Sequence, residues 1–169
     1  MALPRRPRLV LVDAPSQTLS VRDDGREIFS CAVSTGGNGI GCEEGSGKTP
    51  HGWHRISEVF GAGQPLGMRF DSREPTGEVW TEGPVDGDWI TTRILWLDGL
   101  EPGVNRGPGV DTHGRYIYIH GTAREHELGT PGSHGCVRVS NENARTLADE
   151  ILEPGDLVWI GPRPTGDPA

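Results

Sequence analysis

Glycine and proline interrupt this chain too often for long helices to form. There are 26 glycines and 14 prolines among the 169 residues, and inside a helix a glycine costs about 1 kcal/mol and a proline about 3 kcal/mol relative to alanine. A helical bundle is therefore excluded. Apolar residues, counted without glycine, still reach 33% and include five Trp. The chain can thus bury a core, and its length suits one domain.

Hydrophobic periodicity favours strands along most of the chain. Residues 8–12 (RLVLV) form an apolar run typical of a buried strand. In residues 115–120 (RYIYIH), alternation puts Tyr116 and Tyr118 on one face and Ile117 and Ile119 on the other. Further strands are predicted at residues 19–21, 27–33, 53–59, 88–97 and 157–160. Two long Gly-rich loops, 34–50 and 98–114, lie between them.

One helix is predicted near the C-terminal end. Ser140 can cap its start, and Pro154 follows its end. Its buried face is predicted to consist of Ala144, Leu147, Ala148 and Ile151. We therefore expect a mainly β fold, a sandwich or barrel with one packed helix and long Gly-rich loops. The domain is expected at residues 8–161, between tails at 1–7 and 162–169.

Charge and hydropathy exclude several classes of partner. The formal net charge of −8 repels phosphate backbones and argues against nucleic acid. Arg5, Arg6 and Arg8 are a local exception, expected to be a solvated end. The longest aliphatic run, Leu9–Val12, is far shorter than the roughly 20 residues of a membrane span, so no transmembrane segment is expected. The sequence given also lacks the apolar core of a secretory signal.

Residues 41–49 (GCEEGSGKT) resemble a phosphate-binding loop but fail its spacing. That motif needs four residues between its first glycine and the Gly-Lys-Thr, and Cys42 stands where this glycine must be. Glu43 and Glu44 would face the phosphate oxygens, and Pro50 spoils the helix that should follow. Nucleotide binding is not expected.

The segment 119–138 (IHGTAREHELGTPGSHGCVR) concentrates reactive residues. It holds three of the six His and one of the three Cys. Cys136 lies in a flexible turn, four residues before the helix cap at Ser140, where a helix N-terminus favours the thiolate. His120 ends a predicted strand beside Gly121, a place from which it could act as a base.

Three interpretations of this segment remain open on the residues alone. In one, Cys136 is a nucleophile, His120 is its base, and the turn from Ser133 to Cys136 supplies amides that stabilise an oxyanion. In another, His120, His134 and Cys136 bind zinc. This is weaker, because the chain has no Cys-x-x-Cys pair and no helical His-x-x-x-His. In the third, the residues are structural.

The remaining candidates are less informative. Cys31 and Cys42 could pair in an oxidising compartment, but the sequence does not predict that they do. The Glu125-His126-Glu127 run looks like half of a metal motif, yet its polar surroundings favour solvated surface.

The residues that surround Cys136 resemble the L,D-transpeptidase catalytic domain family of the YkuD type. The pattern is a His, a spacer and Ser/Thr-His-Gly-Cys, and here twelve residues separate His120 from Ser133-His134-Gly135-Cys136. The resemblance spans roughly residues 8–160. Its companion positions are Asp13, Gln17, Leu19 and Val21, then Val33-Ser34-Thr35-Gly36, then Lys48-Thr49-Pro50 with Gly52 and Ile56.

This resemblance implies a role for each residue of the segment. Cys136 would attack the L-centred carbonyl of a tetrapeptide stem of peptidoglycan, release D-alanine and form a thioester. His120, oriented by the carbonyl of Gly121, would take the thiol proton. The remaining implied residues are Ser133, His134 and Gly135 for the oxyanion, and Arg138 and Tyr118 for the substrate.

The resemblance also implies partners and a place of action. The acceptor would be an amine of a second stem peptide or of an envelope protein, in the periplasm or cell envelope, and carbapenem-type inhibitors would bind. Neither cofactor nor metal is expected. The alternatives are an L,D-carboxypeptidase that uses the same thioester, a zinc-dependent peptidase and a non-catalytic wall-binding module. The loop 98–114 is predicted to be a lid that excludes water.

Overall fold

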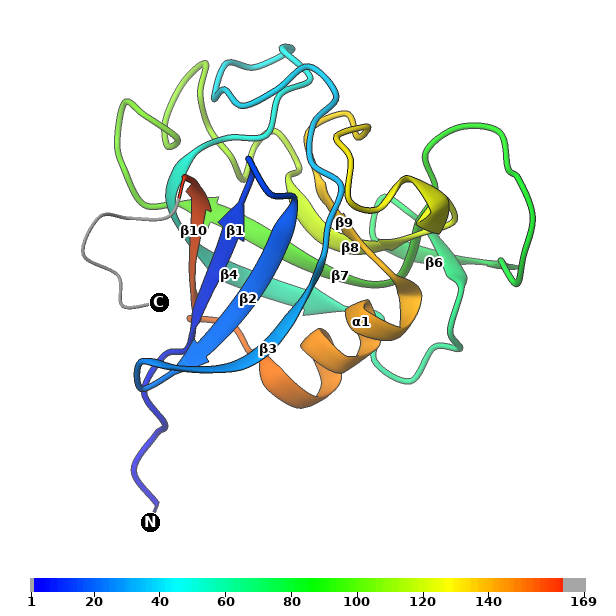
Figure 1. The fold of residues 1–169 in the computed structure, drawn as a ribbon, viewed down its shortest axis with the longest axis horizontal. Helices are drawn as coiled ribbons and strands as arrows, with labels where there is room; N and C mark the ends of the chain where they lie inside the picture. The colour runs from blue at the N-terminus through cyan, green and yellow to red at the C-terminus, as the bar shows by residue number, and fades with distance from the viewer. Residues whose placement is uncertain (1, 163–169) are drawn as a thin grey trace.

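The computed structural model describes residues 2–162, which form one mixed sheet of ten strands with a short helix packed against it (Figure 1). The strands are β1 (Leu9–Asp13), β2 (Thr18–Asp23), β3 (Arg26–Ala32), β4 (Gly52–Phe60), β5 (Met68–Asp71), β6 (Glu74–Val79), β7 (Ile90–Gly99), β8 (Tyr118–Thr122), β9 (Val137–Val139) and β10 (Leu157–Gly161). The helical elements are η1 (Glu125–Glu127), α1 (Asn141–Thr146) and η2 (Leu147–Ile151). The mainly β prediction is confirmed.

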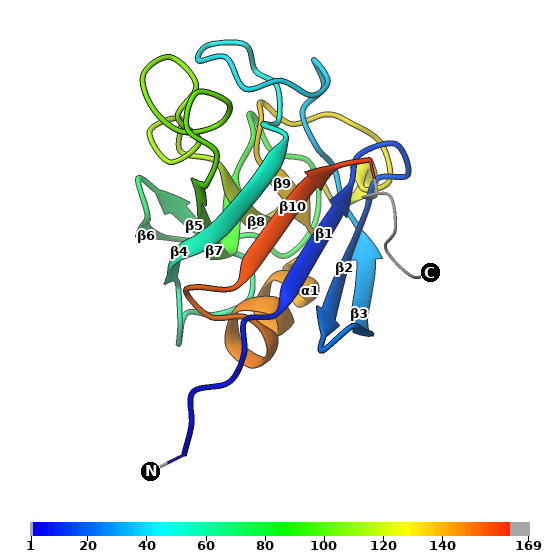
Figure 2. The same ribbon diagram turned by 90° about the vertical axis from the view of Figure 1, so that its left-hand side faces the viewer.

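The strands follow the order β3-β2-β1-β10-β4-β7-β5-β6, and β8 and β9 branch from β7. In Figure 2, β4, β10, β1, β2 and β3 lie side by side, although β10 comes from the far end of the chain. Strand β7 is the centre of the fold, because β4 and β5 pair along one edge of it and β8 pairs along the other.

Seven of the ten strands lie where periodicity predicts them, within a few residues. Strands β5, β6 and β9 were not predicted. The segment of β6, EPTGEV, contains a proline and a glycine and is exposed throughout, so it lacks an apolar pattern. The strand predicted at 115–120 begins only at Tyr118, because Tyr116 has a left-handed backbone (φ 57°) and leaves the sheet.

Two apolar clusters lie on opposite faces of the β7–β8 pair. The larger contains Leu95, Leu97 and Ile119 and is covered by α1. The smaller contains Ile94, Trp96 and Tyr118, and Cys136 packs against it. Alternation along each strand thus separates a structural core from the face that carries the sulfur. The predicted split between Tyr118 and its two isoleucine neighbours is confirmed.

The predicted helix forms, but it is short. The Ser140 hydroxyl accepts the N–H of Asn143, as a capping residue does. After Thr146 the helix widens into one π-type turn, closed by the bond from the Leu152 N–H to the Leu147 carbonyl. Ala144 and Leu147 are fully buried. No helix in the described part of the chain is long and apolar enough to span a membrane.

Two of the three N-terminal arginines, Arg5 and Arg8, are less solvated than the sequence indicates, whereas Arg6 is exposed as expected. The Arg5 guanidinium makes two hydrogen bonds, of 2.9 and 2.7 Å, to the buried carboxylate of Asp156, and Arg8 pairs with Asp23 at 3.0 Å. Buried Asp156 needs a cation, and Arg5 supplies it from the segment expected to be a free tail. The predicted C-terminal tail lies, beyond Pro162, outside the described residues.

Candidate active site

The sheet register brings Cys136 and His120 to one face. Cys136 immediately precedes β9, which pairs in parallel with β8 so that Ile119 faces Val137 and His120 faces Arg138. Because paired residues of parallel strands point to the same side, Cys136 and His120 share a face. They are one strand apart and two residues apart along the strand, which separates their Cα atoms by about 8 Å. Two side chains can bridge this gap.

The Cys136 sulfur is held by backbone groups of the segment that leads into β8. The Tyr118 N–H donates to Sγ at 3.3 Å, and the thiol donates to the Tyr116 carbonyl at 3.5 Å. Burial raises the pKa of the Cys136 thiol to about 12, outweighing the Tyr118 N–H, which lowers it. The sequence predicts a thiolate favoured by the helix N-terminus, and desolvation, the largest influence on this thiol, acts in the opposite direction.

His120 is buried and fixed in one tautomer. Its Nδ1 lies 2.5 Å from the Gly121 carbonyl oxygen. A carbonyl can only accept, so Nδ1 carries the proton and Nε2 has the free lone pair of a base. Burial lowers the pKa of His120, against the opposing effect of the Gly121 carbonyl. The expected contact between His120 and Gly121 is therefore present.

Hydrogen bonds within the turn before Cys136 fix its shape. The Ser133 hydroxyl donates to the Cys136 carbonyl at 2.6 Å and accepts the Gly135 N–H at 3.1 Å. Thr49 donates to the Gly135 carbonyl at 2.7 Å. Gly135 has a φ of 131°, and a Cβ there would lie 3.1 Å from the Lys48 carbonyl oxygen, so a side chain at this position would be strained and crowded.

This bonding changes the set of available amide donors. The Gly135 N–H, expected to face an oxyanion, is already used by Ser133. The N–H groups of His134 and Cys136 have no acceptor among residues 2–162. The His134 side chain is 86% exposed, with Nδ1 3.8 Å from an Asp88 oxygen. Only its backbone is placed to contribute to an oxyanion site.

Arg138 does not lie where a substrate could reach it. Its side chain is 2% exposed and contacts two carboxylates, Asp88 at 3.0 Å and Glu127 at 2.5 Å. The Gly132 carbonyl accepts a further bond. The predicted substrate contact through Arg138 is therefore corrected: the guanidinium neutralises acids beneath the site. Asp88 was not predicted, because no local pattern links it to Cys136, and Glu127, expected on solvated surface, instead binds Arg138.

Tyr118 is likewise buried, at 4% exposure. Its ring packs in the smaller apolar cluster, and its hydroxyl accepts a bond from Arg73 at 3.0 Å. What Tyr118 presents to the sulfur is its backbone N–H. The predicted contact of its side chain with substrate is thus not supported by its position.

The loop 98–114 is bound to its neighbours and does not have the character of a mobile lid. Asn105, fully buried, donates to the carbonyls of His51 and Trp53, both at 3.0 Å. The Thr112 hydroxyl lies 3.0 Å from His54 Nε2. These bonds fasten the loop to the segment around β4, so the predicted lid is corrected to an anchored loop.

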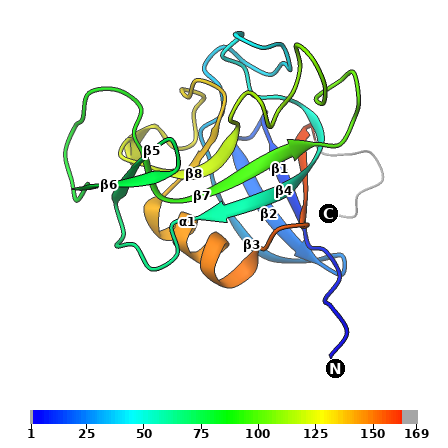
Figure 3. The ribbon, with the colours of Figure 1, turned by 180° about the vertical axis from the view of Figure 1, so that it is seen from behind.

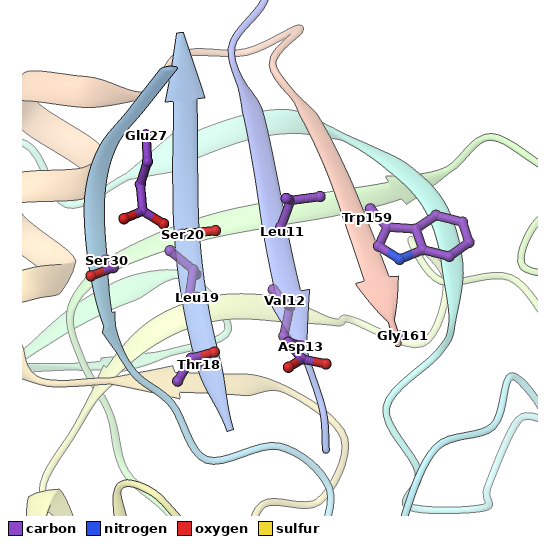
Figure 4. Close-up of a pocket in the computed structure, with 10 residues that line it drawn as sticks. All are labelled: Leu11, Val12, Asp13, Thr18, Leu19, Ser20, Glu27, Ser30, Trp159 and Gly161. Carbon is purple, nitrogen blue, oxygen red and sulfur yellow. The ribbon is translucent and has the colours of Figure 1, made fainter. Parts of the chain in front are cut away.

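Other candidate sites in the described part of the chain offer less. No three His, Cys, Asp or Glu side chains among residues 2–162 gather as metal ligands would. Cys31, Cys42 and Cys136 are all free thiols. A separate hollow on β1, β2, β3 and β10 is drawn in Figure 4, and none of its lining residues belongs to the predicted site.

Known proteins of one family resemble this chain in sequence and in fold. The chain matches the family described as the L,D-transpeptidase catalytic domain, YkuD, over residues 7–160. No curated protein matches it. Its fold is similar to an L,D-transpeptidase from Xylanimonas cellulosilytica, with 22% identity, a TM-score of 0.57, and coverage of 94% of this chain and 62% of that one.

Two further solved structures show the same fold. An L,D-transpeptidase from Stackebrandtia nassauensis has 23% identity and a TM-score of 0.54, and the match covers 96% of this chain and 60% of that one. L,D-transpeptidase 3 from Mycobacterium tuberculosis, in complex with a faropenem-derived adduct, has 17% identity and a TM-score of 0.56, with coverage of 92% and 60%. This chain thus spans about three fifths of the length of these proteins. Since the family match extends over most of its length, the chain belongs to the L,D-transpeptidase catalytic domain family.

Proposed function

We propose that this chain is a cysteine-dependent L,D-transpeptidase of peptidoglycan stem peptides. The observation that carries the proposal is the placement, on one face of the β8–β9 pair, of a thiol and of an imidazole whose free lone pair is on Nε2. Membership of the family supplies the reaction class. A peptidoglycan substrate implies that the protein acts in the periplasm or cell envelope.

The first half of the reaction would form a thioester. His120 Nε2 takes the proton of the Cys136 thiol as Sγ attacks the L-centred carbonyl carbon of the donor. The resulting oxyanion accepts hydrogen bonds from the N–H groups of His134 and Cys136, which are free of other acceptors in the described chain. Losing one such donor costs about 2.7–4 kcal/mol in comparable sites. The C–N bond then breaks, and the imidazolium gives its proton to the departing D-alanine nitrogen.

The second half would consume the thioester. An acceptor amine attacks the acyl carbon, the C–S bond breaks, and the amine's proton returns through His120 to the sulfur. The acceptor is an amine of another stem peptide or of an envelope protein. Water as acceptor would give the carboxypeptidase reaction instead.

Intact-mass spectrometry with a carbapenem tests the nucleophile. The wild-type protein is expected to gain one drug mass, located at Cys136 by peptide mapping, and Cys136→Ser is expected to gain none. Cys31→Ser, which removes a thiol in β3, is the matched control and should react like wild type. An adduct on Cys136→Ser would contradict the assignment.

Product analysis with a tetrapeptide muropeptide tests the reaction. Cross-linked dimers are expected from wild type and not from Cys136→Ser. Tripeptide without dimers would mean that the enzyme hydrolyses the thioester instead of transferring it. Unchanged substrate would refute both the transpeptidase and the carboxypeptidase reaction.

A further inference from the structure

An arginine at the tip of the β5–β6 hairpin is held in an unusual backbone conformation. Asp71 pairs with Glu74, so Ser72 and Arg73 form a two-residue turn, with φ values of 49° and 67°. Such turns normally take Asn-Gly or Gly-Gly, since other residues are strained at positive φ. Strain of this kind persists where surrounding contacts over-determine it, and it is frequent at ligand-binding sites. Figure 3 shows this hairpin beside β7 and β8.

The contacts of Arg73 are aromatic rather than acidic. Its guanidinium carbon lies 4.5 Å from the Trp96 ring centroid and 5.5 Å from that of Tyr116, and its Nη1 donates to the Tyr118 hydroxyl. Among residues 2–162 no carboxylate lies within ion-pair distance of it; Glu58 acts on it only from further away. Arg73 is partly exposed, and its positively charged guanidinium is largely unused, because the hydroxyl occupies only one of its five N–H donors.

The same two tyrosines hold the sulfur. Cys136 Sγ contacts the Tyr118 N–H and the Tyr116 carbonyl, while Arg73 contacts the Tyr118 hydroxyl and the Tyr116 ring. Cys136 also packs against the cluster that contains Trp96 and Tyr118. The thiol and the guanidinium therefore border one aromatic surface. Tyr116 is 56% exposed, so this surface is open to a ligand.

The geometry points to Arg73 as the residue that binds the terminal carboxylate of the acyl donor. This inference rests on the proposed function, in which the leaving residue is a terminal amino acid. Its carboxylate lies one residue beyond the attacked carbonyl, within about 3.6 Å of extended chain. Two other guanidiniums act on the Cys136 sulfur, and both are occupied: Arg138 binds Asp88 and Glu127, and Arg115 binds backbone carbonyls, that of Lys48 at 2.6 Å. A planar guanidinium can bind a carboxylate through two parallel hydrogen bonds.

Alkylation of Cys136 tests the anion site without any peptide. The rate with anionic iodoacetate is divided by the rate with neutral iodoacetamide, and modification at Cys136 is followed by peptide mass spectrometry. Arg73→Gln is expected to lower this ratio about tenfold, as loss of one positive charge near the sulfur would, and Arg73→Lys to keep most of it. The control is Arg69→Gln, which removes a hairpin arginine paired with Glu78 and stacked on Trp89. An unchanged ratio in Arg73→Gln overturns the inference.

Two donors complete the test: a tetrapeptide with a free C-terminal carboxylate and the same peptide as its amide. Arg73→Gln is expected to raise KM for the free acid by about 10- to 100-fold, the range for a hydrogen-bonded charge, and to leave the amide unaffected. An equal loss for both donors means a structural role and refutes the inference. If neither peptide reacts with wild type while the alkylation ratio still depends on Arg73, the proposed function fails and the anion site stands.

Discussion

The charges around Cys136 Sγ act in opposite directions. Asp88 raises the pKa of the thiol, while Arg138 and Arg115 lower it, and burial is larger than any of them. Arg115 is held by a 2.6 Å bond to the Lys48 carbonyl, next to the turn that contains Gly135. Because the thiol pKa is raised and that of His120 is lowered, both groups are neutral at rest at pH 7. Proton transfer must then accompany attack, so the proposed mechanism depends on His120 more than a thiolate enzyme would.

This dependence gives a prediction for His120→Ala. Acylation of Cys136 by a carbapenem at pH 7 is expected to slow by on the order of 10²–10⁴-fold, the range for a lost general base. Without the base, only the thiolate reacts. Its fraction grows tenfold per pH unit below a pKa of about 12, so the variant's rate should rise steeply from pH 7 to 10. Stopped-flow or mass-spectrometric rates check this.

His126→Ala is the control for that experiment, because His126 is 71% exposed in η1. It should retain the wild-type rate and pH profile. A His120→Ala rate equal to wild type, or one that does not vary with pH, would remove His120 from the mechanism.

The two groups of site residues differ in how far sequence could identify them. Cys136, His120 and the carbonyl of Gly121 lie in one local motif and are found together in the structure. Asp88 and Arg73 come from other elements, and only the pairing of β7 with β5 and β8 brings them near. The wrong assignment of Arg138 has a similar cause. Arg138 is buried between Asp88, which is distant in sequence, and Glu127, which the sequence pattern indicated to be solvated.

At the scale of elements, the junction of β7, β8 and α1 is held by one side chain. Asn141 begins α1, and its Oδ1 accepts the hydroxyls of Thr91 and Thr92, both at 2.5 Å. Its Nδ2 donates to the Thr122 carbonyl and to Glu125. Thr92 has a φ of 72° at the point where the β7–β8 register shifts, a conformation that is unfavourable for a β-branched residue. Asn141 thus stabilises the irregular part of β7, the strand with which β8 pairs.

Asn141→Ala is expected to destabilise the fold by about 3 kcal/mol or more. Each buried polar group left without a partner costs about 1–3 kcal/mol, and the variant removes the partner of several. Denaturant unfolding followed by tryptophan fluorescence measures the loss. Asn143→Ala is the control, since the bond that Asn143 makes to the helix cap comes from its backbone N–H. Equal stability of the two variants would show that the side chain of Asn141 does not hold this junction.

At the scale of elements, predictability differs most clearly between β7 and the strands β6 and β9. Strand β7 has eight buried residues in ten, and its β-branched and aromatic composition identifies it. Strand β6 is exposed throughout, and β9 has only three residues, so neither carries a usable period. Both exist because a neighbouring strand, β5 for β6 and β8 for β9, offers an edge to pair with. Pairing of this kind is a tertiary effect that local sequence does not encode.

At the scale of the whole molecule, two neutral histidines, His54 and His120, lie buried in the interior. His54 anchors the loop 98–114: its Nδ1 donates to the Gly52 carbonyl at 3.1 Å, and its Nε2 accepts the Thr112 hydroxyl. Burial lowers the pKa of His54 to about 4 and also lowers that of His120. His54 is therefore uncharged in the folded state at pH 5 and above, and His120 is protonated less readily than in the unfolded chain, which binds protons at both positions near pH 6.5.

Acidification from pH 7 to pH 5 is accordingly expected to reduce the free energy of unfolding. As the pH falls below 6.5, the unfolded state binds protons at these histidines and is thereby stabilised relative to the folded state. The shift of His54 alone, from 6.5 to about 4, corresponds to a loss of about 2 kcal/mol over this interval, and His120 adds to it in the same direction. Urea unfolding at both pH values measures the difference. His54→Asn keeps a donor toward Gly52 but removes the titration, so it should lose about 2 kcal/mol less than wild type. His126→Asn, altered at an exposed position, should lose as much as wild type. Equal stability of the wild-type protein at pH 7 and pH 5 would contradict the burial of neutral histidines in the folded chain.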